Sequence, residues 1–272
     1  MTDRYGVMGH PVAHSKSPFI HASFAAQTSQ DLVYEAIHVK PGGFAEAVKA
    51  FRTAGGSGLN VTLPFKQEAF ALSQTLSHRA RRAGAVNTLS FDGESVHGDN
   101  TDGVGLVRDL VSNLGLEIRS RRVLLLGAGG AARGVLGPLL DEQPSELVVA
   151  NRTVSSAVSL CLAFSDQGVV HSAGFDALEN GAFDLVINAT SAEVSGELPP
   201  VPESALGRDA VVYDMMYGAA PTAFLRWGQA AGARLASDGL GMLVEQAAES
   251  FFVWRGTRPE TAPVLQALRQ SL

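Results

Sequence analysis

Two spacings of apolar residues alternate along the first part of the chain. Short apolar runs are typical of buried strands, and apolar residues three or four positions apart mark one face of a helix. Phe44, Val48 and Phe51 have the helical spacing, and the same spacing recurs over residues 102–114. Strands are expected over residues 5–8, 33–39, 59–63, 84–91 and 95–98. Strand and helix therefore alternate, as in an α/β unit.

A second α/β unit begins where four apolar residues, Val123 to Leu126, run into a glycine-rich turn. Gly127 suits a tight turn, Gly129 lets the backbone approach a pyrophosphate, and Ala132 lets the next helix pack closely. The N-terminus of that helix offers free N–H groups to an anion. This Gly-x-Gly-x-x-Gly/Ala pattern predicts a dinucleotide site, although glycine-rich turns also occur without a ligand.

The strand expected over residues 147–150 indicates which dinucleotide is bound. NAD-binding units usually carry Asp or Glu at the end of this strand, where it binds the ribose 2′-hydroxyl. This chain has Asn151-Arg152-Thr153 there, and a guanidinium suits a 2′-phosphate. An arginine after a strand can also be a solvated cation, but with the glycine turn upstream we expect NADP.

The fold class predicted from these patterns is α/β with two domains. Each half alternates strands and helices, and the helix expected from Asp102 to about Leu114 carries the chain from one to the other. In open α/β sheets a ligand lies beyond the carboxyl ends of the strands. The active site is therefore expected in a cleft between the two domains.

Composition narrows the class of protein. With 272 residues, 46% apolar and 18% charged, the chain can form a sizeable core. A net charge of −6 argues against binding to nucleic acid or to an anionic membrane. No apolar run approaches the roughly 18 residues of a membrane span, and the N-terminus lacks a signal-peptide pattern. The lone Cys161 is expected as a buried core thiol, and a cytoplasmic location is expected.

Polar residues collect at the corners where strands lead into helices. Ser15 and Ser17 flank one corner, where two hydroxyls can hold a carboxylate. Ser17 before a proline is also a strong helix N-cap, and taken alone that interpretation is favoured. Lys66 is expected in the first turn of a helix opened by Pro64, where most lysines are simply exposed.

A third corner, Asp99–Asp102, holds two acids and an asparagine, more than capping alone explains. No His/Cys spacing suggests a metal site.

Motifs in the same order along nearly the whole chain resemble those of the shikimate dehydrogenase family. The most specific are Asn-Val-Thr-x-Pro-Phe-Lys at 60–66 and Gly-Asp-Asn-Thr-Asp-Gly at 98–103. The others cover residues 15–18, 84–88, 127–132, 151–153, 188–191, 214–217 and 238–248. The resemblance implies an oxidoreductase that reduces 3-dehydroshikimate to shikimate with NADPH, reversibly, on the route to chorismate and the aromatic amino acids.

The resemblance also implies domains and roles. Residues 1–101 would form a substrate-binding domain with a mixed, mainly parallel sheet, and residues 102–238 a Rossmann-type NADP-binding domain. Helices from about 239 to 272 would pack back on the first domain. Lys66 and Asp102 would be the catalytic pair. The substrate would be bound by Ser15, Ser17, Thr62, Lys66, Asn87, Asp102, Tyr217 and Gln246. The cofactor would be bound by Gly127, Ala128, Gly129, Gly130, Ala131, Asn151, Arg152, Thr153, Met215 and Gly239.

Two departures from the family pattern stand out. A second arginine often follows the first in the NADP clamp, and this chain has Ser156 there. NADP preference could therefore be weaker. His78 stands where relatives often carry an acid, with an effect that the sequence does not explain.

Alternatives remain at this point. A quinate/shikimate dehydrogenase with broader substrate or NAD use would tend to carry an acid after the second Rossmann strand, where this chain has Arg152. A non-catalytic NADP-binding sensor should have lost Lys66 or Asp102. A folate dehydrogenase would bind a long aromatic substrate, which the hydroxyl-rich set here suits less. The expected partners are small molecules, with the protein a monomer or homodimer.

Overall fold

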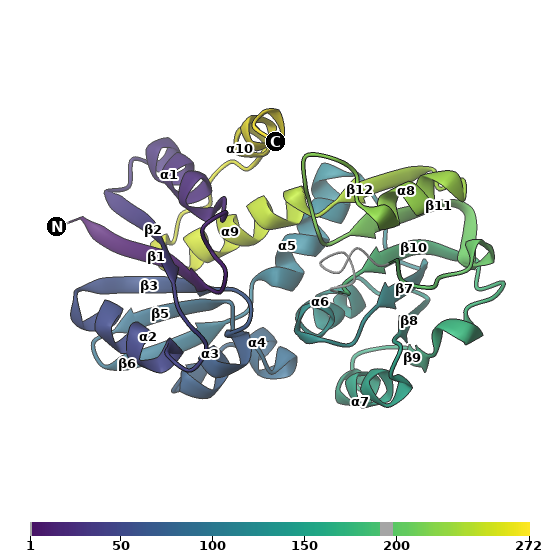
Figure 1. Cartoon of the computed structure of the whole chain (residues 1–272), viewed down its shortest axis with the longest axis horizontal. Helices are drawn as coiled ribbons and strands as arrows, with labels where there is room; N and C mark the ends of the chain where they lie inside the picture. Colours follow the sequence, from purple (N-terminus) through teal and green to yellow (C-terminus); the bar gives the residue numbers. More distant parts are fainter. Residues whose placement is uncertain (1, 191–197) are drawn as a thin grey trace. The chain divides into compact units, whose positions relative to one another are not determined.

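The chain forms two α/β units, each built around a six-stranded sheet (Figure 1). The computed structural model describes residues 2–190 and 198–272, so Ser191 of the 188–191 motif lies outside the described residues. The first unit comprises Met1–Gly105 and Val244–Gln270, and the second comprises Leu106–Leu243 with the last two residues. The predicted two-domain α/β fold is confirmed. The predicted limits at residues 101 and 238 stay predictions, because a compact unit is not necessarily a piece that folds alone.

The sheet of the first unit is mixed and mainly parallel, as expected. Its strands lie in the order β2-β1-β3-β5-β6-β4, where β1 pairs in parallel with β2 and β3, and β5 pairs antiparallel with β3 and β6. The short β4 pairs in parallel with β6. The bounds are β1 Asp3–Gly9, β2 Leu32–His38, β3 Gly56–Val61, β4 Thr75–Leu76, β5 Thr88–Asp92 and β6 Ser95–Asp99.

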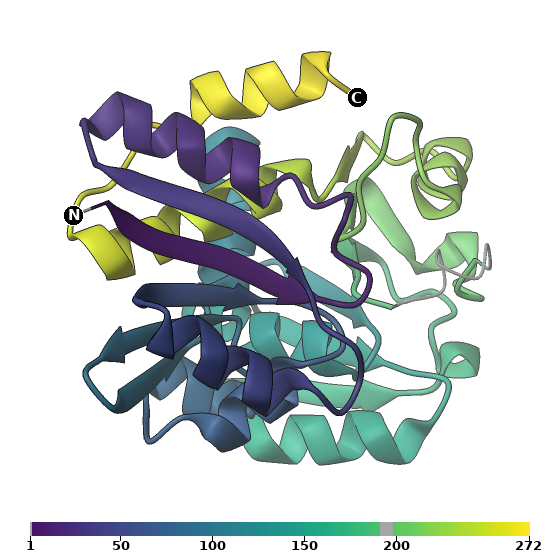
Figure 2. The same cartoon turned by 60° about the vertical axis from the view of Figure 1, so that its left-hand side comes forward.

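Helices cover both faces of this sheet, and in Figure 2 α1 (purple) and α2 (dark blue) lie on opposite sides of the strands. On one face Trp254 of α9 stacks on Tyr5 and donates to the Leu89 carbonyl. On the other face Phe44 of α2 stacks on Phe65, just before α3. The bounds are α1 Ser17–Thr28, α2 Phe44–Thr53, α3 Lys66–Leu72, α4 His78–Ala83, α9 Leu240–Arg255 and α10 Ala262–Gln270.

The second unit has an all-parallel sheet in the order β12-β11-β10-β7-β8-β9, the strand order of a dinucleotide-binding Rossmann fold. Both faces are buried, since Leu125 and Leu124 point into different core clusters. This explains the continuous apolar runs. The strands are β7 Arg122–Leu126, β8 Glu146–Ala150, β9 Val170–Ala173, β10 Phe183–Asn188, β11 Leu206–Asp214 and β12 Leu235–Asp238.

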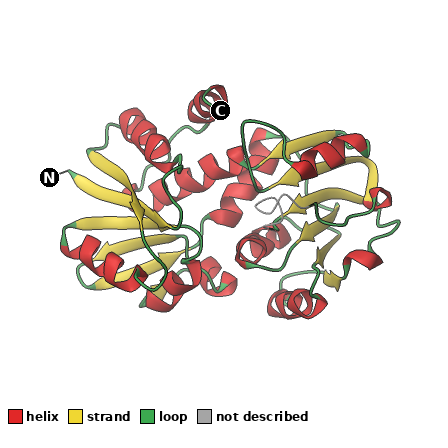
Figure 3. Cartoon of the chain, in the orientation of Figure 1, coloured by secondary structure: helices red, strands yellow, loops and turns green. Residues whose placement is uncertain are grey.

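The helices of the second unit alternate with its strands (Figure 3). They are α6 Gly130–Asp141, α7 Val154–Phe164 and α8 Ala223–Ala230, with short 3₁₀ turns at Phe175–Ala177 and Glu203–Ala205. The predicted helix from Asp102 is α5 Asp102–Arg108, which continues as a π-helical turn, Asp109–Asn113. Cys161 is buried in α7, as expected.

Two local predictions were wrong. Lys16, not Ser17, is the N-cap of α1, and no side chain there caps the helix. Pro64 lies in the turn before α3, whose first residue is Lys66. In both cases proline marks the neighbourhood of a helix start, but the preceding loop sets the residue at which the helical dihedrals begin.

Candidate active site

Lys66 and Asp102 form an ion pair in the first unit. Lys66 begins α3 and Asp102 begins α5, so each side chain leaves the corner between a sheet strand and a helix. Lys66 Nζ donates to Asp102 Oδ2 at 2.6 Å. The Asp102 side chain is 7% exposed and that of Lys66 22% exposed. The ammonium therefore has a fixed partner and still reaches solvent.

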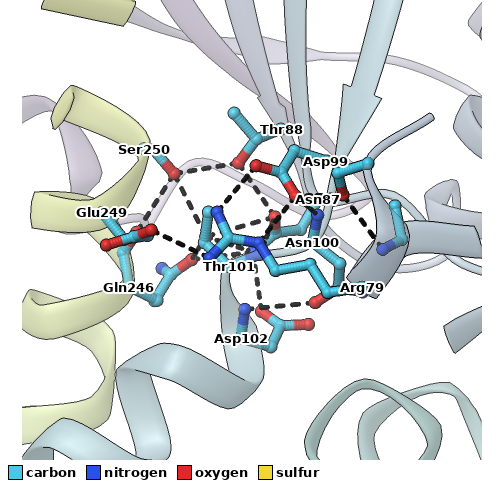
Figure 4. Close-up of polar contacts among 12 residues, drawn as sticks. Arg79, Asn87, Thr88, Asp99, Asn100, Thr101, Asp102, Gln246, Glu249 and Ser250 are labelled. Atoms are coloured by element: carbon cyan, nitrogen blue, oxygen red, sulfur yellow. Dashed lines mark hydrogen bonds and ion pairs between the residues drawn. The ribbon is translucent and has the colours of Figure 1, made fainter. Parts of the chain in front are cut away.

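Asn87 brings Gln246 to this pair. It lies just before β5, fully buried, and its Nδ2 is 2.8 Å from Asp102 Oδ1 and 3.0 Å from Gln246 Oε1. Asn87 Oδ1 accepts from the Thr101 backbone N–H at 2.9 Å. Four residues predicted for the site, Lys66, Asn87, Asp102 and Gln246, thus belong to one polar cluster, most of which Figure 4 shows.

A second layer of buried polar residues supports this cluster. Ser250 lies one helical turn after Gln246 on α9, and its Oγ is 2.9 Å from Asn60 Nδ2 and from Thr88 Oγ1. It also lies 3.2 Å from Thr101 Oγ1. Ser250 belongs to none of the roles predicted from the sequence. Its only signal was the four-residue spacing from Gln246 on the predicted helix.

The two serines predicted to hold a carboxylate are close together. Ser15 Oγ accepts from the Ser17 backbone N–H at 3.2 Å, and Ser17 is buried. Tyr34 of β2 donates to Asn60 Oδ1 at 2.8 Å. Burial raises the pKa of Tyr34 well above its usual value, and a hydrogen bond from Ser17 opposes that rise. Ser17 is therefore connected through Tyr34 and Asn60 to the supporting layer.

Thr62 follows β3 in the same unit, and its methyl group approaches Gly9 closely. A Cβ at Gly9 would lie 2.4 Å from that methyl carbon, so only glycine fits here. This places the Thr62 side chain against the carboxyl end of β1.

The glycine turn of the second unit fits the phosphates of a dinucleotide. Gly127 has φ +103°, and a Cβ there would meet the Ala189 carbonyl oxygen at 3.1 Å. A Cβ on Gly129 or Gly130 would meet nothing within 4 Å, which leaves their backbone open to a ligand. The helix α6 begins at Gly130, so its free N–H groups lie at this open turn. Ala128 and Ala131 pack against the core cluster beneath the turn.

The corner after β8 carries the predicted ribose-phosphate residues. Asn151 Nδ2 donates to the Thr153 carbonyl at 2.9 Å, which shapes the turn around the exposed Arg152. Ser156 lies in the first turn of α7, and its N–H donates to the Thr153 carbonyl. The guanidinium of Arg152 is thus presented to solvent between a strand end and a helix start.

Met215 and Gly239 touch each other in the second unit. A Cβ at Gly239 would lie 2.3 Å from the Met215 carbonyl oxygen, so a side chain there would push the two segments apart. The buried Asp214 shapes this corner by accepting from Asn188 Nδ2 at 3.2 Å and from the Met216 N–H at 3.1 Å.

Tyr217 belongs to the second unit, not to the first with the other predicted substrate residues. Burial raises the pKa of its phenol, and the charge of Asp238 adds to the rise. The phenol therefore stays protonated and can act as a hydrogen-bond donor.

Within the described residues no group of three or more His, Cys, Asp or Glu is placed to hold a metal ion. Nor is any described helix long and apolar enough to cross a membrane. His78 is the first residue of α4, which Ser77 caps through the Ala80 N–H, and the structure assigns His78 no role.

Family models match most of the chain. The shikimate dehydrogenase substrate binding domain matches residues 7–89, shikimate / quinate 5-dehydrogenase matches 109–195, and the shikimate 5′-dehydrogenase C-terminal domain matches 239–269. Shikimate dehydrogenase (NADP(+)) of Alkalilimnicola ehrlichii is 58% identical over 269 residues, 99% of each chain. The protein of the same name from Nitrosospira multiformis is 57% identical, covering 100% of this chain and 99% of its own.

Solved structures agree with these matches. An Ael1 enzyme from Pseudomonas putida superposes with a TM-score of 0.93 at 48% identity, covering 98% of both chains. Shikimate 5-dehydrogenase of Thermus thermophilus, in complex with NADP(H) and shikimate, gives a TM-score of 0.88 at 32% identity. That match covers 99% of this chain and all of the other.

Proposed function

The chain belongs to the shikimate dehydrogenase family, and on that premise we propose that it reduces 3-dehydroshikimate to shikimate with NADPH, reversibly, in aromatic amino acid biosynthesis. The observation that carries the proposal is the Lys66–Asp102 ion pair, held by Asn87 among buried hydroxyl and amide groups. The pair joins the first residues of two helices, α3 and α5.

Lys66 is the proton donor of the proposed reaction. NADPH, when bound, supplies the hydride. As the carbonyl carbon accepts it, negative charge grows on the ketone oxygen, and the Lys66 ammonium stabilises that charge and donates a proton. Asp102 orients the ammonium through their 2.6 Å hydrogen bond. Asp102 also accepts a hydrogen bond from a neighbouring hydroxyl of the substrate. In the reverse direction the neutral amine takes the proton back.

The remaining polar side chains bind the substrate. Ser15 and Ser17 hold its carboxylate, since the Ser15 hydroxyl lies 3.2 Å from the Ser17 backbone nitrogen at the start of α1. Asn87 and Gln246 meet the ring hydroxyls, because both already share the polar cluster of Asp102. Thr62 and Tyr217 complete the set that binds the hydroxyls and the ring.

NADP is held by the second unit. The backbone of Gly127, Ala128, Gly129, Gly130 and Ala131 cradles the pyrophosphate at the N-terminus of α6. Asn151, Arg152 and Thr153 bind the adenosine ribose and its 2′-phosphate, with Arg152 supplying the charge. Met215 and Gly239 lie against the nicotinamide. Ser156 leaves this clamp with one arginine fewer than in many relatives, which weakens the preference for NADP.

Initial rates of NADPH oxidation with 3-dehydroshikimate, and of NADP⁺ or NAD⁺ reduction with shikimate and quinate, test the proposal. We expect turnover with 3-dehydroshikimate and shikimate, and higher kcat/KM with NADP⁺ than with NAD⁺. Comparable rates with quinate and NAD⁺ would instead identify the broader quinate/shikimate enzyme. Binding of NADPH without turnover of any of the three would identify a sensor.

Two further proposals concern the whole protein. We propose that it lies in the cytoplasm, and we expect it to be a monomer or a homodimer. Light scattering of the purified protein decides between those two states.

A further inference from the structure

Arg79 joins two elements of the candidate site. It lies on α4, and its guanidinium forks in two directions. Nε and one terminal nitrogen donate to the two oxygens of Asp99, each at 2.7 Å, and the other terminal nitrogen donates to Glu249 Oε1 at 2.8 Å. One residue thus connects the end of β6 with α9 (Figure 4).

The carboxylates of Asp99 and Glu249, which Arg79 binds, each accept further hydrogen bonds. Asp99 Oδ1 also accepts from Ser77 Oγ and from the Asn100 backbone N–H at 2.7 Å, and Glu249 Oε2 accepts from Arg258. Burial alone would raise the pKa of Asp99, but the hydrogen bonds and charge of Arg79 outweigh it and hold that pKa below its usual value. Glu249 behaves in the same way, through Arg258 and Arg79. Stability alone is a weak explanation for a buried ionic cluster, because the cost of desolvating the charges offsets most of their attraction.

The Asp99 arm of the fork leads to Asp102. Asp99 fixes the Asn100 N–H, and Asn100 Oδ1 accepts from the Asp102 N–H at 3.1 Å. Asn100 Nδ2 donates to the Ala85 carbonyl at 3.0 Å, which anchors the turn on its other side. The start of α5, and with it the Asp102 carboxylate, is therefore set by a chain of hydrogen bonds that begins at Arg79.

The Glu249 arm leads to Gln246. Glu249 lies three residues after Gln246 on α9 and directly before Ser250, so fixing its carboxylate fixes the rotation of the helix. Ser250 holds the same helix from the other side through Asn60, Thr88 and Thr101. The position of Gln246 beside Asn87 therefore depends on the contacts of Glu249 and on those of Ser250.

We propose that Arg79 is a positioning residue that sets the spacing between Asp102 and Gln246, and so the place of the substrate ring relative to Lys66. The proposal rests on the proposed function for its kinetic consequences. Only a planar fork can bind two carboxylates from two elements at fixed angles, and a lysine ammonium offers a point charge without that geometry.

Kinetics of Arg79→Lys and Arg79→Gln test the proposal. We expect both variants to lose about 10- to 100-fold in kcat/KM for 3-dehydroshikimate, the order of loss from a small misplacement of reacting groups. The Kd for NADPH should stay at the wild-type value. Arg79→Lys should unfold nearer the wild-type temperature than Arg79→Gln, because it keeps a cation between the two carboxylates.

Arg122→Lys is the matched control. Arg122 lies in the second unit, where its guanidinium binds a single carboxylate, that of Glu146, with Nε donating to Oε1 at 2.6 Å. It should lose thermal stability without a selective loss in 3-dehydroshikimate turnover. If Arg79→Lys and Arg79→Gln keep wild-type kcat and KM below their melting temperatures, Arg79 is only a structural residue and the proposal is wrong.

Amide hydrogen exchange gives a readout that does not depend on the substrate. In Arg79→Lys, exchange should rise in residues 99–105 and 244–250 and stay unchanged in the second unit, relative to wild type. Unchanged exchange in both segments would overturn the positioning role. An inactive wild-type protein with raised exchange in the variant would reject the proposed function and keep the positioning role.

Discussion

Lys66 and Asp102 are coupled because they share one short hydrogen bond. Lys66→Ala removes the ammonium that we propose donates the proton and stabilises the growing charge. We expect kcat to fall by about 10²–10⁴-fold, the usual contribution of general acid catalysis. KM for 3-dehydroshikimate should change much less, because the lost interaction is made mainly in the transition state. Steady-state kinetics below the melting temperature measure both quantities.

Asp102→Asn is the companion variant, since it keeps the shape of the side chain and removes the charge that orients the lysine. It should also lose kcat. The double variant should be little worse than either single one, because the two residues act as a unit. Additive losses in log kcat would mean that the residues work independently, and an active Lys66→Ala enzyme would falsify the catalytic assignment.

His21 makes folding stability depend on pH. It is buried on α1 and stacks on Tyr34 at 4.2 Å, and burial lowers its pKa from 6.5 to about 3, against a hydrogen bond to Asn60 that raises it. Between these two values the unfolded chain binds a proton that the folded protein does not. The free energy of unfolding should therefore decrease as the pH is lowered below about 6.5, and this group contributes up to roughly 1.4 kcal/mol per pH unit to the decrease.

His21→Phe isolates that contribution. The ring can still stack on Tyr34, and the buried Nε2, which has no hydrogen-bond partner among the described residues, is replaced by carbon. Urea unfolding at pH 7 and pH 5 should show a smaller loss of stability in the variant than in wild type. Parallel pH dependence in the two proteins would show that His21 takes up its proton as readily in the folded protein as in the unfolded chain, so that burial does not lower its pKa.

We propose that the corner between β8 and α7 decides the cofactor preference. Arg152→Ala should raise KM for NADP⁺, with little change in KM for NAD⁺. The increase should correspond to a loss of roughly 2–3 kcal/mol of binding free energy, the value of a charge-assisted hydrogen bond.

Ser156→Arg tests the same corner in the opposite direction. The exposed Arg152 lies just before the first turn of α7, which contains Ser156, so this variant adds a second cation at the corner. It should lower KM for NADP⁺ alone. Equal effects on both cofactors would remove the 2′-phosphate role.

Among the helices and strands, the sequence predicts those that a local pattern of residues determines. The apolar run at Val123–Leu126 and the glycines after it specified β7, the turn and α6, because a buried parallel strand and a positive φ each restrict residue choice locally. The short β4 and α4 were not predicted. Two strand residues, and six helical residues of which four are arginine or histidine, carry no periodic signal.

The residues of the candidate site, like the helices and strands, were predicted where a local sequence pattern marks them. Lys66, Asn87, Asp102 and Gln246 could be named from motifs, and the structure joins them. The supporting contact between Asn60 and Ser250 spans 190 residues of sequence, and nothing near either residue indicates the other. Long-range polar partners of this kind depend on which helix packs on which face of the sheet, so only the fold reveals them.

At the scale of the whole molecule, the chain passes between its two units within helices. Helix α5 begins in the first unit and continues in the second, and α9 begins in the second and returns to the first. The first unit is therefore not a continuous piece of sequence. The returning helix supplies the buried Phe251, the ring of Trp254 on Tyr5, and the buried hydroxyl of Ser250.

A fragment of residues 1–105 should therefore fail to fold cooperatively, because removing α9 exposes the face of the sheet that carries Tyr5 and leaves Asn60 and Thr88 without Ser250. Fusing residues 244–272 to it through a flexible linker should restore a sigmoidal urea transition, and far-UV circular dichroism measures the transition in the fragment and in the fusion alike. The matched control is the same fusion carrying Ser250→Val and Phe251→Ala, which should unfold at lower urea because it lacks the buried hydroxyl and a large core ring. A cooperative transition in residues 1–105 alone, with the midpoint of the fusion, would show that the predicted domain of residues 1–101 needs no returning helix.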